Sequence, residues 1–255
     1  MKFMITGGSG YLGMNLIKHL QHIDCTYINY DYTLGFDILD DRLLYQKMKG
    51  CDAVVHLAAL PDISYCEKNI DEAIDVNLLG TCKVVEAANR CGIPVVMIST
   101  FAAKAAHNVY GLTKRLAEKA TLRYGTNVVL RLANVYGGLG YLQKKRSAVS
   151  SFIKHWQMGQ MATIYGDGSN QRDFVHVSDV CNAIVLAFGA PPGTYEICTR
   201  KYTSIKELAD LIGVEYDHMP PRSVDVDKVP YEKGNDALGW KPKVKLKDGL
   251  KELMK

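Results

Sequence analysis

A chain of 255 residues is long enough for one large domain, or for a main domain with a smaller lobe. Hydrophobic residues make up 47% and charged residues 23%, as in an ordinary globular protein, and the net charge of +4 excludes the strong basic bias of a dedicated nucleic-acid binder. The seven cysteines lack the paired spacing of metal ligands, and their odd number argues against a disulfide framework, so we expect no metal site.

Short apolar runs alternate with helical patterns through the first two-thirds of the chain. Strands are predicted at residues 2–6, 26–31, 53–58, 95–100 and 128–133. Helices are predicted at residues 13–22, 74–90 and 110–123. The apolar runs lack polar alternation, which is typical of a parallel sheet covered by helices on both faces. The pattern predicts an α/β fold, a Rossmann-type doubly wound parallel sheet.

Glycine-rich turns become frequent after about Gly137, and an irregular basic segment opens at residues 220–222. We therefore expect residues 1–140 to form the main domain. Residues 175–190 are expected to return to its sheet, and the rest of residues 141–255 to form a smaller C-terminal substrate-binding lobe. The sequence shows no internal repeats.

A glycine-rich loop joins the first predicted strand to the first helix. Its glycines satisfy both G-x-G-x-x-G and G-x-x-G-x-x-G. Such glycines permit a tight turn, let backbone approach a pyrophosphate and allow close helix packing, while the helix N-terminus attracts the anion. A glycine-rich turn is often only a turn, but this one stands between the first strand and the first helix. The loop predicts dinucleotide contacts by Gly7, Gly10, Tyr11, Leu12 and Gly13.

An acidic residue, Asp31, ends the second predicted strand at about the distance expected from that loop. Its carboxylate could accept hydrogen bonds from the adenosine ribose hydroxyls, and it would repel a 2′-phosphate. The position therefore favours NAD over NADP. The alternative is that Asp31 merely starts a turn.

Tyr110 and Lys114 stand four residues apart, on one face of a predicted helix. A nearby ammonium favours the phenolate form of a tyrosine, which is what a general base near neutral pH requires. The same spacing occurs by chance on many helices. Its context strengthens the hypothesis, because the preceding strand ends in Ser99-Thr100, whose hydroxyls could line the same cleft.

These motifs carry a resemblance over nearly the whole chain. Besides TGGSGYLG and YGLTK, the chain contains HLAA, DVNLLGT, RLANVYG and YGDGSNQRDFVHV in the same order as a known family. It resembles the NAD-dependent epimerase/dehydratase family of extended short-chain dehydrogenases/reductases, and within it enzymes similar to UDP-glucose 4-epimerase. The block at residues 165–177 is the most specific of these motifs.

The resemblance implies a role for each matching position. Asp37 and Ile38 would hold the adenine, and Asn77 would also contact the cofactor. Ala133 would lie near the nicotinamide. The segment Leu57, Ala58 and Ala59 would line the dinucleotide.

The substrate would be a nucleotide sugar, bound by Asn134 and by Arg172 on its diphosphate, which suits a bidentate guanidinium. Thr100 would contact the sugar. Arg222 and Asp225 match a later R-x-G-D pattern in which Val224 replaces the glycine, so they could instead be a surface arginine and a turn aspartate.

The implied chemistry is a 4-epimerisation of a UDP- or dTDP-sugar. Tyr110 would take a hydroxyl proton, Thr100 would bind the same oxygen, Lys114 would hold the nicotinamide ribose, and bound NAD would take and return a hydride. Residues 101–109 form a shorter connection than is usual, and they begin Phe-Ala-Ala without the acidic residues of dehydratases and decarboxylases.

Two alternatives to a 4-epimerase remain open. One is a keto-sugar reductase or dehydratase variant; the other is a catalytically idle dinucleotide-binding relative.

The expected surroundings follow from the same sequence. Met1 leads directly into strand-like sequence without a signal peptide, and no apolar run could cross a bilayer, so we expect a cytoplasmic protein without membrane contacts. The resemblance implies a homodimer formed through two helices from each subunit. The apolar residues for that face would be Ile74, Leu78, Val85, Leu112 and Leu116, which could alternatively face the chain's own sheet.

Overall fold

The computed structural model describes residues 1–144, 147–221, 230, 231 and 238–255. Two of the predicted substrate-binding residues, Arg222 and Asp225, lie outside the described residues. No helix in the described part of the chain is long and apolar enough to cross a membrane.

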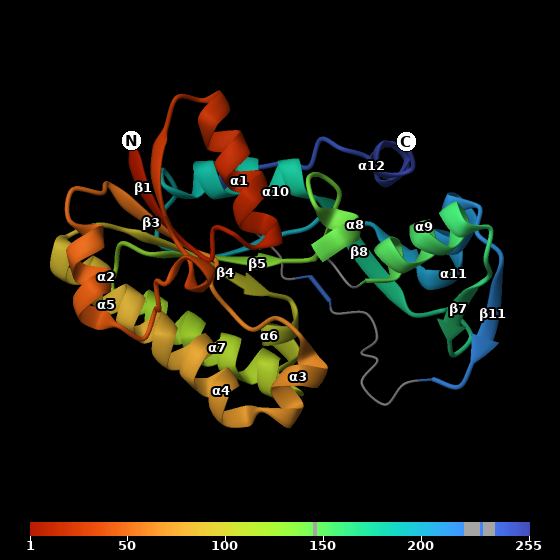
Figure 1. The fold of residues 1–255 in the computed structure, drawn as a ribbon, viewed down its shortest axis with the longest axis horizontal. Coiled ribbons are helices and arrows are strands. Elements are labelled where there is room, and N and C mark those ends of the chain that lie inside the picture. The colour runs from red at the N-terminus through yellow and green to blue at the C-terminus, as the bar shows by residue number, and fades with distance from the viewer. Residues whose placement is uncertain (145–146, 222–229, 232–237) are drawn as a thin grey trace.

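A six-stranded parallel sheet forms the centre of the main domain (Figure 1). Its order is β2-β1-β3-β4-β5-β9. The strands are β1 (Lys2–Thr6), β2 (Thr26–Tyr30), β3 (Ala53–His56), β4 (Val95–Thr100), β5 (Val128–Leu132) and β9 (Gly193–Ile197). The predicted parallel α/β fold is therefore confirmed, and the first five strands fall where the apolar runs predict them.

Helices cover both faces of this sheet (Figure 1). One face carries α1 (Tyr11–His22) and α10 (Val177–Ala187); the other carries α2 (Asp41–Met48), α5 (Thr81–Cys91) and α7 (Val109–Leu122). Alternate residues of a strand point to opposite faces, so Phe3 and Ile5 of β1 enter one core and Met4 enters the other. Burial on both faces explains why the strands lack polar alternation.

The chain returns to the main sheet in two elements. Residues 175–190, which were expected to return, include α10, which packs against α1. The strand that completes the sheet is β9, which lies beyond that predicted segment.

The smaller lobe contains two short sheets and their helices (Figure 1). One sheet has the order β10-β8-β6 and the other pairs β11 with β7. These strands are β6 (Asn134–Tyr136), β7 (Ala162–Tyr165), β8 (Gln171–His176), β10 (Tyr202–Ser204) and β11 (Tyr216–Met219). The helices of this region are α8 (Tyr141–Lys144), α9 (Ala148–Met158), α11 (Ile205–Ile212) and the C-terminal α12 (Leu246–Leu253).

Short elements complete the carboxyl edge of the main sheet. They are η1 (Tyr32–Leu34) after β2, α3 (Ile63–Lys68), α4 (Ile70–Ile74) and a π-helical turn η2 (Asp75–Gly80) before α5, and α6 (Ala102–Ala105) between β4 and α7. In open α/β sheets, ligands bind outside the carboxyl ends of the strands, so these elements surround the expected site.

Candidate active site

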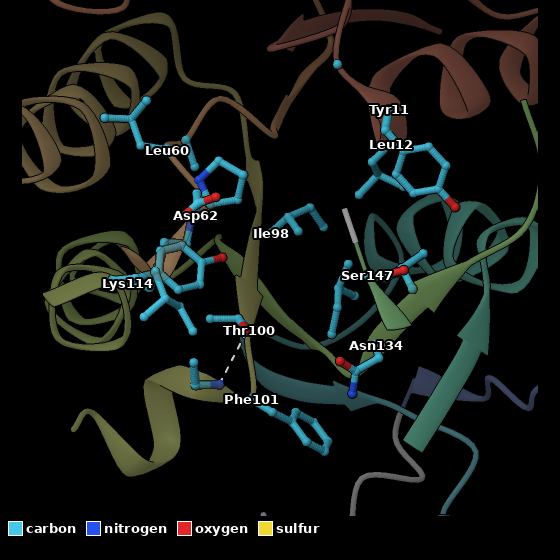
Figure 2. A pocket seen from close by; sticks show the side chains of 18 of the residues that line it. Tyr11, Leu12, Leu60, Asp62, Ile98, Thr100, Phe101, Lys114, Asn134 and Ser147 are labelled. Atoms are coloured by element: carbon cyan, nitrogen blue, oxygen red, sulfur yellow. Dashed lines mark hydrogen bonds between the residues drawn. The ribbon is translucent and has the colours of Figure 1, made fainter. Parts of the chain in front are cut away.

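A cleft of about 1730 Å³ lies between the carboxyl edge of the main sheet and the lobe. Figure 2 shows Lys114 on the left of this cleft, Asn134 and Ser147 on the right, and Thr100 between them. Every predicted site residue within the described chain lines it, with the exception of Asn77. The structure thus brings together residues that are far apart in the sequence, from Gly7 to Arg172.

The glycine-rich loop fits a dinucleotide because its backbone is packed too closely for side chains. Gly7 has a φ of +72°, and a Cβ there would lie 2.7 Å from the Ala58 nitrogen. A Cβ on Gly13 would lie 2.5 Å from the Gly8 Cα. Helix α1 begins directly after Gly10 without a side-chain cap, so the positive end of its dipole faces the cleft-lining loop. This arrangement suits a pyrophosphate.

Asp31 ties the loop to the end of β2. One carboxylate oxygen accepts a hydrogen bond from the Ser9 N–H at 2.9 Å, and the other accepts from the Thr33 N–H at 2.9 Å and hydroxyl at 2.6 Å. The side chain lines the cleft while remaining largely buried. Asp31 therefore caps η1, as the alternative interpretation has it, and also presents a negative charge to the cleft wall. That charge opposes a 2′-phosphate.

The predicted adenine and nicotinamide positions follow in the same cleft wall. Asp37 and Ile38 line the cleft, and so does the segment 57–59 after β3. Ala133 lies where the chain leaves the main sheet, and its N–H donates to the Ile197 carbonyl at 3.1 Å.

Asn77 lies behind this wall. It is fully buried in η2 and does not line the cleft. Its Oδ1 accepts a hydrogen bond from the Leu60 N–H at 2.7 Å, and its Nδ2 donates to the Leu60 carbonyl at 3.1 Å. Leu60 lines the cleft, so Asn77 supports the cleft wall from behind through these two hydrogen bonds.

Thr100, Tyr110 and Lys114 meet at the carboxyl end of β4. Thr100 is the last residue of that strand, and Tyr110 lies in the first turn of α7, where the Asn108 side chain caps the helix by accepting from the Gly111 N–H at 2.8 Å. Lys114 follows one turn later and is only 3% exposed. The predicted catalytic set is therefore assembled in one place.

Burial shifts the pKa values of Tyr110 and Lys114 in opposite directions. It raises the pKa of Tyr110 to about 12, although a hydrogen bond with Thr100 acts in the opposite direction. Burial lowers the pKa of Lys114 to about 8, while the Glu118 carboxylate raises it. Lys114 is then still mostly cationic at neutral pH. A phenolate at Tyr110 needs positive charge in the cleft beyond what these residues provide.

The lobe supplies the opposite wall of the cleft. The predicted residues Asn134 and Arg172 lie there, and the Asn134 amide donates to the Asp173 carbonyl at 3.1 Å. The sequence reasoning missed further residues of this wall: Ser147, Ser151, Lys154, Tyr165 and Tyr202. Two signals could have indicated some of them: the serine pair that caps α9 before its apolar run, and the position of Tyr165 at the start of the motif at residues 165–177.

The short connection between Thr100 and Tyr110 borders the reacting end of the cleft. Phe101, Ala102, Ala105, His107 and Asn108 line it, and none of these cleft-lining residues is acidic. Lys104 in α6 makes an ion pair with Glu196 of β9 and donates to the Pro230 carbonyl at 2.6 Å. The His107 side chain in this connection is solvent-exposed.

The parallel α/β fold, the glycine-rich loop and the Thr100, Tyr110 and Lys114 set together define the class of the protein. It is a dinucleotide-dependent enzyme with the site of an oxidoreductase. Among the described residues, no cluster of histidine, cysteine, aspartate or glutamate could hold a metal ion.

Comparisons with known proteins place the chain in a family of such enzymes. The model of the NAD-dependent epimerase/dehydratase family matches residues 3–198, so the chain belongs to that family and is an NAD-dependent enzyme. It is 28% identical to a putative UDP-glucose 4-epimerase of Methanocaldococcus jannaschii, over 98% of this chain and 96% of that protein. It is also 28% identical to a dTDP-glucose 4,6-dehydratase of Streptomyces niveus, over 99% of this chain and 91% of that protein.

A solved structure shares the whole architecture. The UDP-glucose 4-epimerase of Thermotoga maritima, determined with UDP-glucose, superposes with a TM-score of 0.90 at 26% identity, over 100% of this chain and 97% of that chain. The family and the fold of the chain are thereby established.

Proposed function

We propose that the protein is a 4-epimerase of a UDP- or dTDP-linked sugar. The observation that carries the proposal is the composition of the reacting end of the cleft. Thr100, Tyr110 and Lys114 are assembled there, and the cleft-lining residues of the connection that follows Thr100 include no acid. Elimination of water needs such a proton donor, whereas epimerisation needs, besides bound NAD as hydride acceptor, only the base that takes the hydroxyl proton.

The chain's own residues divide the work of this reaction. NAD, when bound, supplies the hydride acceptor. Tyr110 takes the proton of the sugar hydroxyl, and Thr100 holds the same oxygen through its hydroxyl. Lys114 holds the nicotinamide ribose and supplies positive charge that favours the Tyr110 phenolate. Arg172 and Asn134 hold the nucleotide sugar across the cleft, and Lys154 adds a second cation to that wall.

Charge distribution supports an anionic substrate on the lobe side. The cleft-lining acids of the main domain are Asp31, Asp37, Asp62, Glu72 and Asp75. The lobe wall instead presents Lys154 and Arg172. Among the described residues of this wall the acid is Asp173, which already accepts hydrogen bonds from the Thr199 N–H at 2.9 Å and the Tyr231 hydroxyl at 2.7 Å. A diphosphate is therefore favoured on this side.

Incubation with a panel of UDP-, dTDP- and GDP-sugars tests the proposal. We expect the purified enzyme to interconvert a UDP- or dTDP-sugar with its 4-epimer without net consumption of NAD. A product that has lost water, or stoichiometric use of the dinucleotide, would instead identify a dehydratase variant or a keto-sugar reductase. No turnover of any sugar, with intact NAD binding, would support a catalytically idle relative.

A homodimer is part of the proposal, built on the surface of α4, η2 and α7. Ile74, Leu112 and Leu116 are 37%, 49% and 42% exposed there, and Ile70 and Leu79 are exposed nearby. Two residues expected on this face are not on it. Leu78 is partly buried and packs against Met97, Ala117 and Val129, and Val85 is buried in the chain's own core, so for these two residues the alternative holds and they face the chain's own sheet.

A further inference from the structure

Glu118 occupies a buried position one helical turn beyond Lys114. Its carboxylate accepts hydrogen bonds from Arg131 Nε at 2.9 Å and Nη2 at 2.7 Å, and the Ser99 hydroxyl donates to the same carboxylate. Glu118 and Ser99 are each 3% exposed. Ser99 lines the cleft beside Thr100, whereas Glu118 and Arg131 are not among the cleft-lining residues.

The fold brings these residues together for a simple geometric reason. Tyr110, Lys114 and Glu118 follow one another at four-residue spacing and so lie along one side of α7. Ser99 and Arg131 are direct neighbours in the parallel pairing of β4 and β5. One carboxylate thus joins the helix that carries Tyr110, the strand that ends in Thr100, and the strand that leads to Ala133.

We propose that Glu118 is a positioning residue for the reaction. Its carboxylate fixes α7 against the ends of β4 and β5 and is the counter-charge that keeps Lys114 cationic. The role of Glu118 in catalysis rests on the proposed function. Its effect on the charge of the Lys114 ammonium does not, and can be measured without a substrate.

The other groups around Lys114 cannot replace this counter-charge. His56 on β3 is fully buried, with hydrogen bonds to the hydroxyls of Thr6 and Thr81, and burial lowers its pKa to about 3, so it is neutral. Tyr110 on the same helix is a neutral phenol until it loses its proton. Arg131 on β5 is a cation and Ser99 on β4 is uncharged. Glu118 is therefore the anion in this buried group, consistent with its effect on Lys114.

The balance of charges distinguishes positioning from ordinary packing. Replacing Glu118 by glutamine leaves two buried cations, Lys114 and Arg131, so Lys114 should lose its proton more readily. Replacing Arg131 as well removes the second cation and returns the local charge to that of Lys114 alone. If Glu118 and Arg131 were only a structural ion pair, the second substitution would not restore the pKa of Lys114.

The test measures the pKa of Lys114 directly, in protein without NAD or sugar. The protein is labelled with lysine carrying ¹³C at Cε, and the Lys114 signal is assigned by its loss in Lys114→Met. We expect Glu118→Gln to lower this pKa by about one unit or more. We expect Arg131→Gln to raise it, and the double variant Glu118→Gln/Arg131→Gln to return it toward the value of the unchanged protein.

Three controls separate charge from contact. Ser99→Ala removes a hydrogen bond to Glu118 without changing any charge, and Glu118→Asp keeps the charge, so both should leave the pKa of Lys114 nearly unchanged. Glu86→Gln removes an exposed acid of α5 that accepts a hydrogen bond from the Tyr124 hydroxyl, and should also have no effect. The double variant removes the Glu118 and Arg131 charges together, so neither is left buried without the other, and it should provide a folded protein even if Glu118→Gln is unstable.

Two outcomes would overturn the inference. One is an unchanged pKa of Lys114 in Glu118→Gln. The other is an equal shift in Ser99→Ala, which would assign the effect to packing. Neither outcome depends on turnover, so failure of the proposed 4-epimerase activity is a separate result. With an active substrate, the high-pH limit of kcat/KM should move to lower pH in Glu118→Gln and recover in Glu118→Asp.

Discussion

A phenol in a buried site is a poor base until positive charge is placed beside it. The pKa of Tyr110 is raised to about 12 by burial, above that of an exposed tyrosine. Lys114 provides one positive charge on the same helix, and the oxidised nicotinamide ring of NAD would provide another. The site is thus built to become basic when the cofactor is in place.

Replacing Tyr110 by phenylalanine tests that base. The change removes one hydroxyl and keeps the ring, so the fold and NAD binding should survive while turnover falls by roughly 10²-fold or more. Calorimetry with NAD and a rate measurement on the substrate identified from the sugar panel check both parts. Near-normal turnover in this variant would exclude Tyr110 as the base.

Arg172 should contribute to substrate affinity and not to stability. A charge-assisted contact with diphosphate is worth roughly 1.5–3 kcal/mol, so Arg172→Met should raise the KM by about tenfold or more. Lys206→Met, which removes an exposed cation from α11 in the same lobe, is the matched control and should leave the KM unchanged. If Arg172→Met lowered the melting temperature at constant KM, Arg172 would be a structural residue instead.

At the scale of elements, the short connection after Thr100 is held by one buried ion pair. The side chains of Lys104 in α6 and Glu196 in β9 are only 10% and 1% exposed. The pair attaches the loop beside the reacting end of the cleft to the last strand of the main sheet. A loop held in this way can be short and still have a fixed shape.

Removing Lys104 should therefore be costly. Lys104→Met takes the Lys104 cation away from the buried Glu196 carboxylate, and breaking a buried pair in this way costs roughly 3–5 kcal/mol of the free energy of unfolding. Urea unfolding measures the loss. Lys119→Met on the exposed side of α7 should change stability by less than about 0.5 kcal/mol. Equal stability of the two variants would contradict a structural role for the pair.

The elements of the main domain could be predicted because hydrophobic periodicity and the glycine loop are local signals. Strands β1 to β5 and the phosphate loop follow from short stretches of sequence. The return strand β9 and the lobe wall depend on contacts between distant segments, which no local pattern reveals. Asn77 illustrates the limit, because its position near the site was predictable, but its two hydrogen bonds to the Leu60 backbone, made from the π-helical turn of η2, were not.

At the scale of the whole molecule, the exposed apolar face of α4, η2 and α7 predicts a dimer. A self-complementary face closes an assembly at two subunits, so light scattering should give about twice the 28.3 kDa chain mass. Leu112→Glu/Leu116→Glu should produce a folded monomer. Leu211→Glu, which changes an equally exposed leucine on α11, should remain dimeric. A monomer in the unchanged protein would reject the assembly.

The passage from β5 to β6 has a consequence for variation in chain length. Leu132 pairs in the main sheet and Asn134 pairs with Phe174 in the lobe sheet, so only Ala133 separates the two. Since side chains alternate along a strand, one inserted residue would turn Asn134 to the opposite face and displace the lobe wall relative to the nicotinamide position. We expect such an insertion to abolish turnover while NAD still binds, whereas an insertion at the exposed turn around Pro191 should be tolerated. Natural or engineered exchange of the lobe between related enzymes would therefore have to keep this junction at constant length.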